Sequence, residues 1–172
     1  MRAGVLAFAA AMAAAVATGA SLAPNTVEIT PKLVTSGQPS REALAKLSEQ
    51  GYGAVIYLAP PTVHDAVQDE PVILDRQSIA FVNIPIDFER PTEADYETFA
   101  FQLKKQGERK LLVHCQVNLR ASSMVFLYRV IEQKQDPHRA YAEVSSVWVP
   151  NATWKRYMRD MLHKRGIAFE PY

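Results

Sequence analysis

Residues 111–130 read LLVHCQVNLRASSMVFLYRV, and they contain Cys115, the only cysteine in the 172-residue chain. The apolar run before the cysteine predicts a buried strand in KLLVHC, residues 110–115. After a short loop, the residues from about Arg120 onward have helical periodicity, and the expected buried face contains Met124, Val125, Tyr128 and Ile131. This stretch is therefore expected to form a strand, a loop and a helix in succession.

Apolar runs and helical patterns alternate along the rest of the chain. Strands are expected at the start of LVTSGQPS (33–40), at 54–58 and at 79–87, with Pro85 marking the end of the last one. Helices are expected at 41–50 after Ser40, near 72–78, and after Thr92, Asp136 and Asn151, and Asp95 suits a capping box with Thr92. The alternation indicates an α/β fold: a single domain with a mostly parallel central sheet flanked by helices on both faces.

The N-terminal residues 1–24, MRAGVLAFAAAMAAAVATGASLAP, have a different character. One early Arg, an apolar run and small residues at its end are typical of a secretory signal peptide. We expect a signal peptide over residues 1–20, cleaved after Ala20 or Ala23, and a single domain over 24–172. An uncleaved membrane anchor is the alternative. The expected location is the periplasm or the exterior of the cell, with no stable membrane insertion after cleavage.

Composition limits the possible partners and cofactors. Without Arg2, the 19 Lys and Arg become 18, which equals the 18 Asp and Glu. A mature chain with no net charge argues against a nucleic-acid partner. One cysteine cannot form an internal disulfide. None of the four histidines lies at metal-ligand spacing from another, so neither a metal nor another cofactor is expected.

The position of Cys115 suggests chemistry. In parallel α/β sheets, ligands bind beyond the carboxyl ends of the strands, and the loop after Cys115 leads into a helix N-terminus. The backbone N–H groups of Gln116–Leu119 would form an anion cradle in which a cysteine is favoured as thiolate. Arg120 would hold two oxygens of a phosphate. The alternative is that Cys115 is a small buried hydrophobic residue.

The segment HCQVNLRAS (114–122) resembles the signature loop of cysteine-dependent phosphatases in the protein tyrosine phosphatase superfamily. The chain is most similar to its bacterial branch, the phosphatase-like domain of the β-lactamase-hydrolase-like family. Three stretches carry this resemblance in the family's order: LVTSGQPSREALAKLSEQGYGAVIYL, FVNIPIDFERPTEADYETF and LLVHCQVNLRAS. The resemblance implies a metal-independent phosphatase that hydrolyses a phosphate monoester, either protein phosphotyrosine or a small phosphorylated molecule, through a phosphocysteine.

By the same resemblance, Cys115 is the nucleophile, Arg120 is the phosphate ligand and Asp87 is the general acid, with Glu89 and Asp95 as rivals. Gln116, Val117, Asn118 and Leu119 would complete the phosphate-binding loop. His114 would organise the loop through hydrogen bonds. Ser122 or Ser123 would assist the departing thiolate.

Two other functions fit parts of the same pattern. Four residues separate Cys115 from Arg120, where the common phosphatase loop has five, and four is also the spacing in many rhodanese-type sulfurtransferases. Asn118 stands where the family often has Gly, and Asn is a residue that tolerates positive φ. A sulfurtransferase acting through a Cys115 persulfide and a non-catalytic phosphate-binding domain therefore remain alternatives to a phosphatase.

Overall fold

The protein, represented by a computed structural model, is described for residues 22–172, and the predicted signal peptide lies outside the described residues. A five-stranded sheet forms the centre, in the order β1-β2-β5-β3-β4. Its strands are β1 (Val27–Thr30), β2 (Leu33–Ser36), β3 (Tyr52–Tyr57), β4 (Ala80–Asn83) and β5 (Lys110–His114). Neighbouring strands among β2 to β5 pair in parallel, and β1 pairs with β2 in antiparallel fashion. The predicted α/β fold with a mostly parallel sheet is confirmed.

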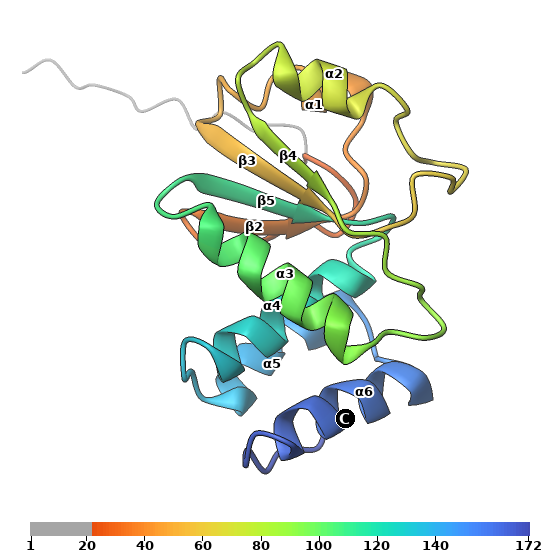
Figure 1. The fold of residues 1–172 in the computed structure, drawn as a ribbon, viewed down its shortest axis with the longest axis vertical. Coiled ribbons are helices and arrows are strands. Elements are labelled where there is room, and N and C mark those ends of the chain that lie inside the picture. Colours follow the sequence, from red (N-terminus) through yellow and green to blue (C-terminus); the bar gives the residue numbers. More distant parts are fainter. Residues whose placement is uncertain (1–21) are drawn as a thin grey trace, which may run out of the picture.

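Helices cover both faces of this sheet, as predicted (Figure 1). Above it in that view lie α1 (Arg41–Leu44) and α2 (Glu70–Asp75). Below it lie α3 (Glu93–Lys105), α4 (Leu119–Ile131), α5 (Pro137–Val147) and α6 (Ala152–His163). Successive residues of a strand point to opposite faces, so Val55 packs in the core with α1 and α2 while Ile56 packs in the other core.

Helix α4 lies at the centre of the larger core, and all its residues from Arg120 to Ile131 are buried. It contacts β2 and β5 on one side and α5 and α6 on the other. A helix buried all round is expected to be held rigidly, because close-packed interiors leave little room for movement. The loop before α4 is consequently fixed at both ends, by β5 and by this helix.

The predicted helix caps are present. Thr92 and Asp95 form a capping box at the start of α3, and Asp136 and Asn151 cap α5 and α6 with their side chains. Each cap satisfies backbone N–H groups that have no partner inside the helix. These local signals placed the starts of three helices correctly.

Other element boundaries differ from the prediction. The helix expected over 41–50 ends at Leu44, because the chain then tightens into three-residue turns that return it to β3. Leu44 and Leu47 are both fully buried, and their three-residue spacing fits such turns as well as a helix. Strand β4 covers four residues, so the expected strand over 79–87 ends at Asn83. Strand β1 was not expected, since it is short and only half buried.

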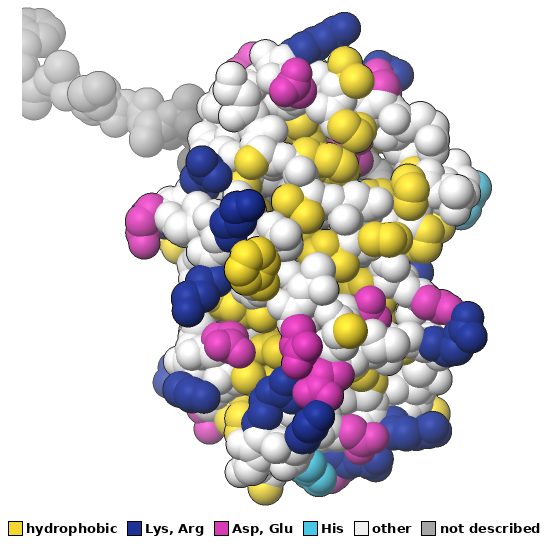
Figure 2. Space-filling model, in the orientation of Figure 1, with side chains coloured by type: hydrophobic (Ala, Val, Ile, Leu, Met, Phe, Trp, Pro, Cys, Tyr) yellow, Lys and Arg dark blue, Asp and Glu magenta, His cyan; other side chains and the backbone are white. Residues whose placement is uncertain are grey.

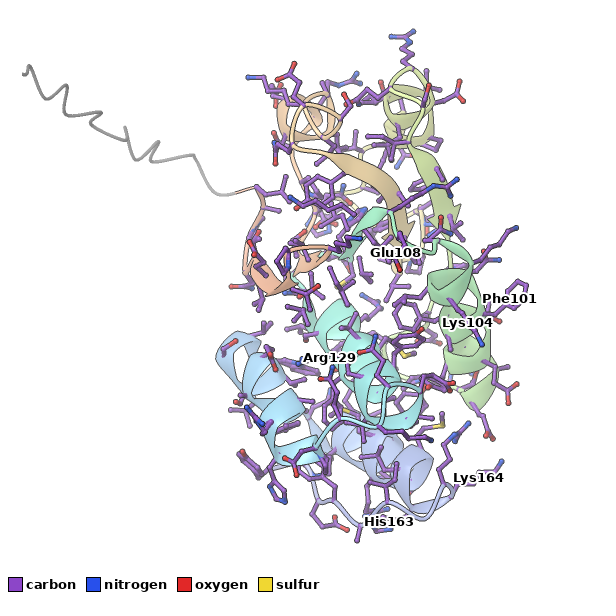
Figure 3. The ribbon with its side chains drawn as sticks, turned by 90° about the vertical axis from the view of Figure 1, so that its left-hand side faces the viewer. Phe101, Lys104, Glu108, Arg129, His163 and Lys164 are labelled. Atoms are coloured by element: carbon purple, nitrogen blue, oxygen red, sulfur yellow. The ribbon has the colours of Figure 1, made fainter. Side chains whose placement is uncertain are left out.

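The surface carries mixed charge. On the face in Figure 2, Lys and Arg side chains lie among Asp and Glu side chains over the helical lower half. In the side view of Figure 3, Phe101 projects outward from α3, and 66% of it is exposed. Arg129, labelled there on α4, is buried and pairs with Glu143 at 3.0 Å. Within residues 22–172, no helix has the length and hydropathy needed to cross a bilayer.

Candidate active site

The carboxyl ends of four strands meet at one edge of the sheet. Ser36, Tyr57 and His114 are the last residues of β2, β3 and β5, and they are aligned in register. Asn83 ends β4 beside Tyr57. The segments that follow these strands therefore share this edge, and Cys115 directly follows β5 there. This is the position at which parallel sheets bind ligands.

The loop from Cys115 to α4 is tied to two other segments. Its backbone accepts a hydrogen bond at the Gln116 carbonyl from the Gln38 N–H at 2.9 Å. Asn118, the N-cap of α4, has φ of 72°, and its Nδ2 donates to the Asn25 carbonyl at 2.6 Å and to Thr35 Oγ1 at 3.0 Å. Asn25 Nδ2 in turn donates to the Val117 carbonyl at 3.0 Å. Asn118 adopts the positive φ expected of it, and these contacts hold it there.

A close approach at Gly37 brings the neighbouring segment against this loop. A Cβ atom on Gly37 would lie 2.8 Å from the Gln116 carbonyl oxygen and 3.0 Å from that of Pro24. The Gly37 N–H donates to the Pro24 carbonyl at 2.7 Å. Since any side chain here would push these backbones apart, glycine is the residue that allows the loop its position.

Cys115 is fully buried, and its backbone N–H donates to the Ser36 carbonyl at 3.2 Å. The side chain follows the strand end directly and precedes the helix N-terminus, as predicted. Only the short loop Gln116–Asn118 separates it from the first residue of α4. A sulfur at the base of such a loop can meet an anion that the loop's N–H groups bind.

Arg120 belongs to the first turn of α4, and 7% of it is exposed. Its Nε donates to the Ile86 carbonyl at 3.0 Å, and its Cζ lies 5.0 Å from the centroid of the Phe88 ring. The two terminal nitrogens have no hydrogen-bond partner among residues 22–172. They are therefore available for a bidentate contact with two oxygens of a bound anion.

Asp87 lies between the two residues that contact Arg120, and its side chain is exposed. It accepts hydrogen bonds from the Glu89 N–H at 2.9 Å and from Arg90 Nε at 3.0 Å. The Glu89 N–H, followed by Arg90, holds the pKa of the Asp87 carboxyl below its usual range. Glu89 is exposed on the same loop, whereas Asp95 is engaged in the capping box of α3.

His114 has a partner that the sequence did not indicate. Its Nε2 lies 2.7 Å from Glu70 Oε1, and both side chains are buried. Gln38 Nε2 donates to the other carboxylate oxygen of Glu70 at 3.0 Å. The Tyr57 ring stacks on the imidazole with 4.7 Å between centroids. Burial, followed by the nearby Asp65 and Glu70 charges, raises the pKa of the Tyr57 hydroxyl.

A second carboxylate from the same stretch also reaches the loop. Gln116 Nε2 donates to Asp65 Oδ1 at 3.0 Å. Both residues line a groove of about 990 Å³ whose charged lining residues are Glu42, Lys46 and Asp65. The stretch 57–70 is polar, with a single His and three acidic residues, and nothing in this pattern indicates that two of the carboxylates face the site.

The hydroxyl side chains after Arg120 differ in their contacts. Ser122 Oγ donates to the Leu119 carbonyl at 3.2 Å, within the first turn of α4. Ser123 Oγ is buried and has no hydrogen-bond partner within the described chain. Of the other residues predicted to line the loop, Val117 is 44% exposed and Leu119 begins α4. Residues 22–172 contain no group of three His, Cys, Asp or Glu side chains placed to hold a metal ion.

Comparison with known proteins identifies the family of the chain. A family model described as "DSP-PTPase phosphatase fused to NAD+ Kinase" matches residues 11–160. A β-lactamase hydrolase-like protein of Xylella fastidiosa (strain Temecula1 / ATCC 700964) is 30% identical over 154 residues, which are 84% of this chain and 35% of that protein. The chain thus spans about a third of this relative's length.

Solved structures share the fold. A putative phosphatase (DUF442) from Shewanella putrefaciens CN-32 has a TM-score of 0.75 and 27% identity, over 83% of this chain and 91% of the other. A cysteine-to-serine variant of TpbA from P. aeruginosa, in complex with pTyr, has a TM-score of 0.60 and 20% identity, over 83% of each chain. The second likeness supports the fold alone.

Proposed function

Because the chain belongs to the DSP-PTPase phosphatase family, we propose that it hydrolyses a phosphate monoester through a phosphocysteine at Cys115. The Cys115 thiolate attacks phosphorus while the bond to the leaving oxygen breaks, and Asp87 gives that oxygen a proton. Water then attacks the phosphocysteine and loses a proton to Asp87, which releases inorganic phosphate and the Cys115 thiolate. Arg120 and the loop N–H groups stabilise the charge on the phosphoryl oxygens throughout.

One observation supports this assignment most strongly. Arg120 donates to the Ile86 carbonyl and faces the Phe88 ring, so it contacts the residues immediately before and after Asp87. The anion-binding side chain and the segment with the candidate acid are thereby joined within the structure. A sulfurtransferase has no need for a carboxylic acid beside its cysteine, whereas hydrolysis of an unactivated phosphate ester does.

The charges around the loop favour a substrate with a single phosphate. The groove beside Gln116 is lined by two acidic residues, Glu42 and Asp65, and one basic residue, Lys46. A polyphosphorylated substrate would place additional negative charge against this lining, at an energetic cost. We therefore propose a monophosphate carried on a weakly charged body, either phosphotyrosine in a protein or a small phosphorylated molecule.

The first test is hydrolysis of p-nitrophenyl phosphate by the protein from residue 21 onward, with reductant and a metal chelator. We expect turnover that is abolished in Cys115→Ser and strongly reduced in Arg120→Lys, which keeps the charge but loses the bidentate geometry. Thiosulfate:cyanide sulfurtransfer is measured on the same samples. Sulfurtransfer without ester hydrolysis, from a chain with a titratable thiol, would refute the proposal in favour of a persulfide enzyme.

We also propose that the chain is exported to the periplasm or beyond the cell. The support is the sequence pattern of residues 1–24 described above. The test is N-terminal sequencing of the protein recovered from fractionated cells. Ser21 or Pro24 is the expected first residue, and a full-length chain in the cytoplasmic fraction would contradict the proposal.

A further inference from the structure

We propose that Trp154 of α6 is a positioning residue for the general acid, because it fixes the segment 86–92, here called the acid loop. This inference rests on the proposed function, since it concerns the step in which Asp87 protonates the leaving group. The Asp87 side chain itself is exposed and contacts Glu89 and Arg90 of its own loop. Its place relative to Cys115 therefore depends on how the backbone around it is held.

The peptide groups on both sides of Asp87 are anchored. The Ile86 carbonyl accepts from Arg120 Nε at 3.0 Å, and the Phe88 carbonyl accepts from Trp154 Nε1 at 3.0 Å. One anchor comes from the helix that follows the phosphate-binding loop, and the other comes from the C-terminal part of the chain. Together they fix the peptide backbone of Asp87 between two elements that do not belong to the acid loop.

Trp154 is itself held firmly. The residue is fully buried, and its backbone N–H donates to Asn151 Oδ1 at 2.9 Å at the start of α6. Its ring lies 5.7 Å from that of Phe88, between centroids, and the Phe88 ring also contacts the Arg120 guanidinium. A buried indole whose N–H has a partner positions that partner well, because breaking the bond would leave both groups unsatisfied.

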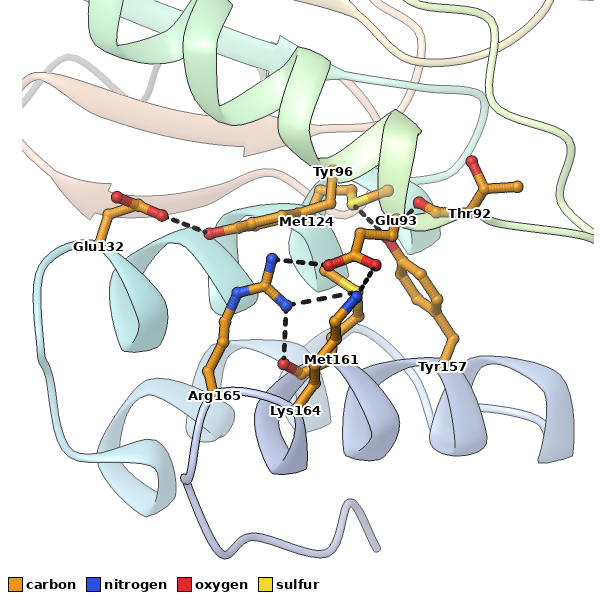
Figure 4. A network of polar contacts seen from close by, with 9 residues as sticks. All are labelled: Thr92, Glu93, Tyr96, Met124, Glu132, Tyr157, Met161, Lys164 and Arg165. Carbon is orange, nitrogen blue, oxygen red and sulfur yellow. Dashed lines mark hydrogen bonds and ion pairs between the residues drawn. The ribbon is translucent and has the colours of Figure 1, made fainter.

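The far end of the acid loop is anchored to the same helix (Figure 4). Tyr157 donates its hydroxyl to the Thr92 carbonyl at 2.9 Å. At the start of α3, Glu93 pairs with Lys164 at 2.5 Å and with Arg165 at 3.2 Å. These contacts hold α6 along the start of α3, so the acid loop is expected to keep its position and not to open as a lid.

The loss of the Trp154 N–H should therefore impair both steps in which Asp87 transfers a proton, and only the first of them, protonation of the leaving group, depends on which ester is used. The Phe88 peptide would be freed, and Asp87 would spend less time aligned with the leaving oxygen. An ester of p-nitrophenol hardly needs protonation of its leaving group, whereas phenyl phosphate does, since phenolate is the more basic. Phosphate binding by Arg120 and the loop should change little.

The experiment compares kcat/KM and kcat of Trp154→Phe with those of wild type on these two esters. Phenylalanine keeps an aromatic ring at this buried position and removes the N–H donor. We expect kcat/KM for phenyl phosphate, which reports the first step alone, to fall about tenfold more than kcat/KM for p-nitrophenyl phosphate, because general acids contribute about 10²–10⁴-fold and only their alignment is impaired. Inhibition by inorganic phosphate should be nearly unchanged. In an Asp87→Asn background, Trp154→Phe should cause no additional difference between the esters.

Trp148→Phe is the matched control. Trp148 belongs to the same aromatic cluster, with its ring centroid 5.9 Å from that of Phe88 and 6.3 Å from that of Trp154. Its Nε1 has no hydrogen-bond partner in the described chain, so its loss should leave the ratio between the esters unchanged. If Trp154→Phe fails to fold, Tyr157→Phe tests the same idea through the Thr92 carbonyl, with an effect in the same direction.

The outcomes separate the two proposals. If wild type turns over both esters and Trp154→Phe lowers kcat/KM equally for the two, or not at all, the positioning role is refuted while the phosphatase stands. The positioning role is also refuted if Trp148→Phe changes the ratio as much as Trp154→Phe does. If wild type hydrolyses neither ester, the proposed function fails and this inference fails with it.

Discussion

Replacing Glu70 by Ala is expected to destabilise the fold, although Glu70 lies in a stretch whose sequence suggests a surface loop. Glu70 is 2% exposed. Its ionised carboxylate accepts hydrogen bonds from two donors, His114 Nε2 and Gln38 Nε2. His114 is fully buried, so its ring nitrogen would lose its partner with no water to replace it. Gln38 is half buried and can turn toward solvent.

The expected loss in unfolding free energy is about 2–4 kcal/mol. An unsatisfied buried group costs about 1–3 kcal/mol, and breaking a buried charged pair costs about 3–5 kcal/mol, so the estimate lies between them. With a urea m-value of about 2 kcal/mol per M, the unfolding midpoint should fall by roughly 1–2 M. Glu70→Gln should lower the unfolding free energy by roughly half as much, because the amide oxygen can still accept from His114 Nε2 while its NH2 group can no longer accept from Gln38 Nε2.

Urea unfolding at 25 °C, followed by far-UV circular dichroism, measures this loss. Glu108→Ala is the control. Glu108 pairs with Lys32 at 2.6 Å, close to the 2.7 Å of the buried His114–Glu70 pair, but both Glu108 and Lys32 are exposed. An exposed pair is screened by solvent, so this midpoint should hardly move. If Glu70→Ala and Glu108→Ala unfold at the same urea concentration, burial does not decide the strength of these contacts and the reasoning is refuted.

Substitutions at three other positions test the loops of the site. Arg90→Ala removes a contact that lowers the pKa of Asp87, so the pKa of Asp87 should rise. The basic limb of the plot of kcat/KM against pH, where the acid loses its proton, should therefore move to higher pH. An unmoved limb would exclude Asp87 as the acid. At Asn118, φ is 72°, and a left-handed conformation costs about 1–2 kcal/mol in residues other than Gly. In a competition assay, Asn118→Gly should therefore bind inorganic phosphate more tightly than Asn118→Leu. Gly37→Ala should raise KM, because its Cβ would meet the Gln116 carbonyl at 2.8 Å, and an unchanged KM would show that the loop tolerates displacement.

Much of the fold was predictable because its signals are local. The apolar runs of β3 and β5 and the cap residues Thr92, Asp136 and Asn151 each report on their own surroundings. The end of α1 was not predictable in the same way. Leucines three residues apart suit a helix and a series of tight turns equally, and the need to return the chain to β3 decides between them.

The candidate site was predictable where it is continuous in sequence. The strand, loop and helix around Cys115 follow one another, so their junction could be inferred directly. Glu70 and Asp65 could not be inferred, because a carboxylate in a polar stretch is usually solvated, and only the folded chain brings them to His114 and Gln116. The contact of Trp154 with Phe88 spans 66 residues and likewise leaves no mark in either local sequence.

The contacts of Asn25 have a practical consequence for anyone who wishes to shorten this protein. The first strand begins at Val27, which would suggest a convenient starting point for a minimal fragment. A fragment starting there would keep all the strands and helices described for residues 22–172. It would lack the Asn25 carbonyl, which accepts from Asn118, and the Asn25 amide, which donates to the Val117 carbonyl. Such a fragment is expected to fold and to be catalytically impaired. We therefore expect the functional unit to be larger than the folding unit, with a boundary upstream of Val27.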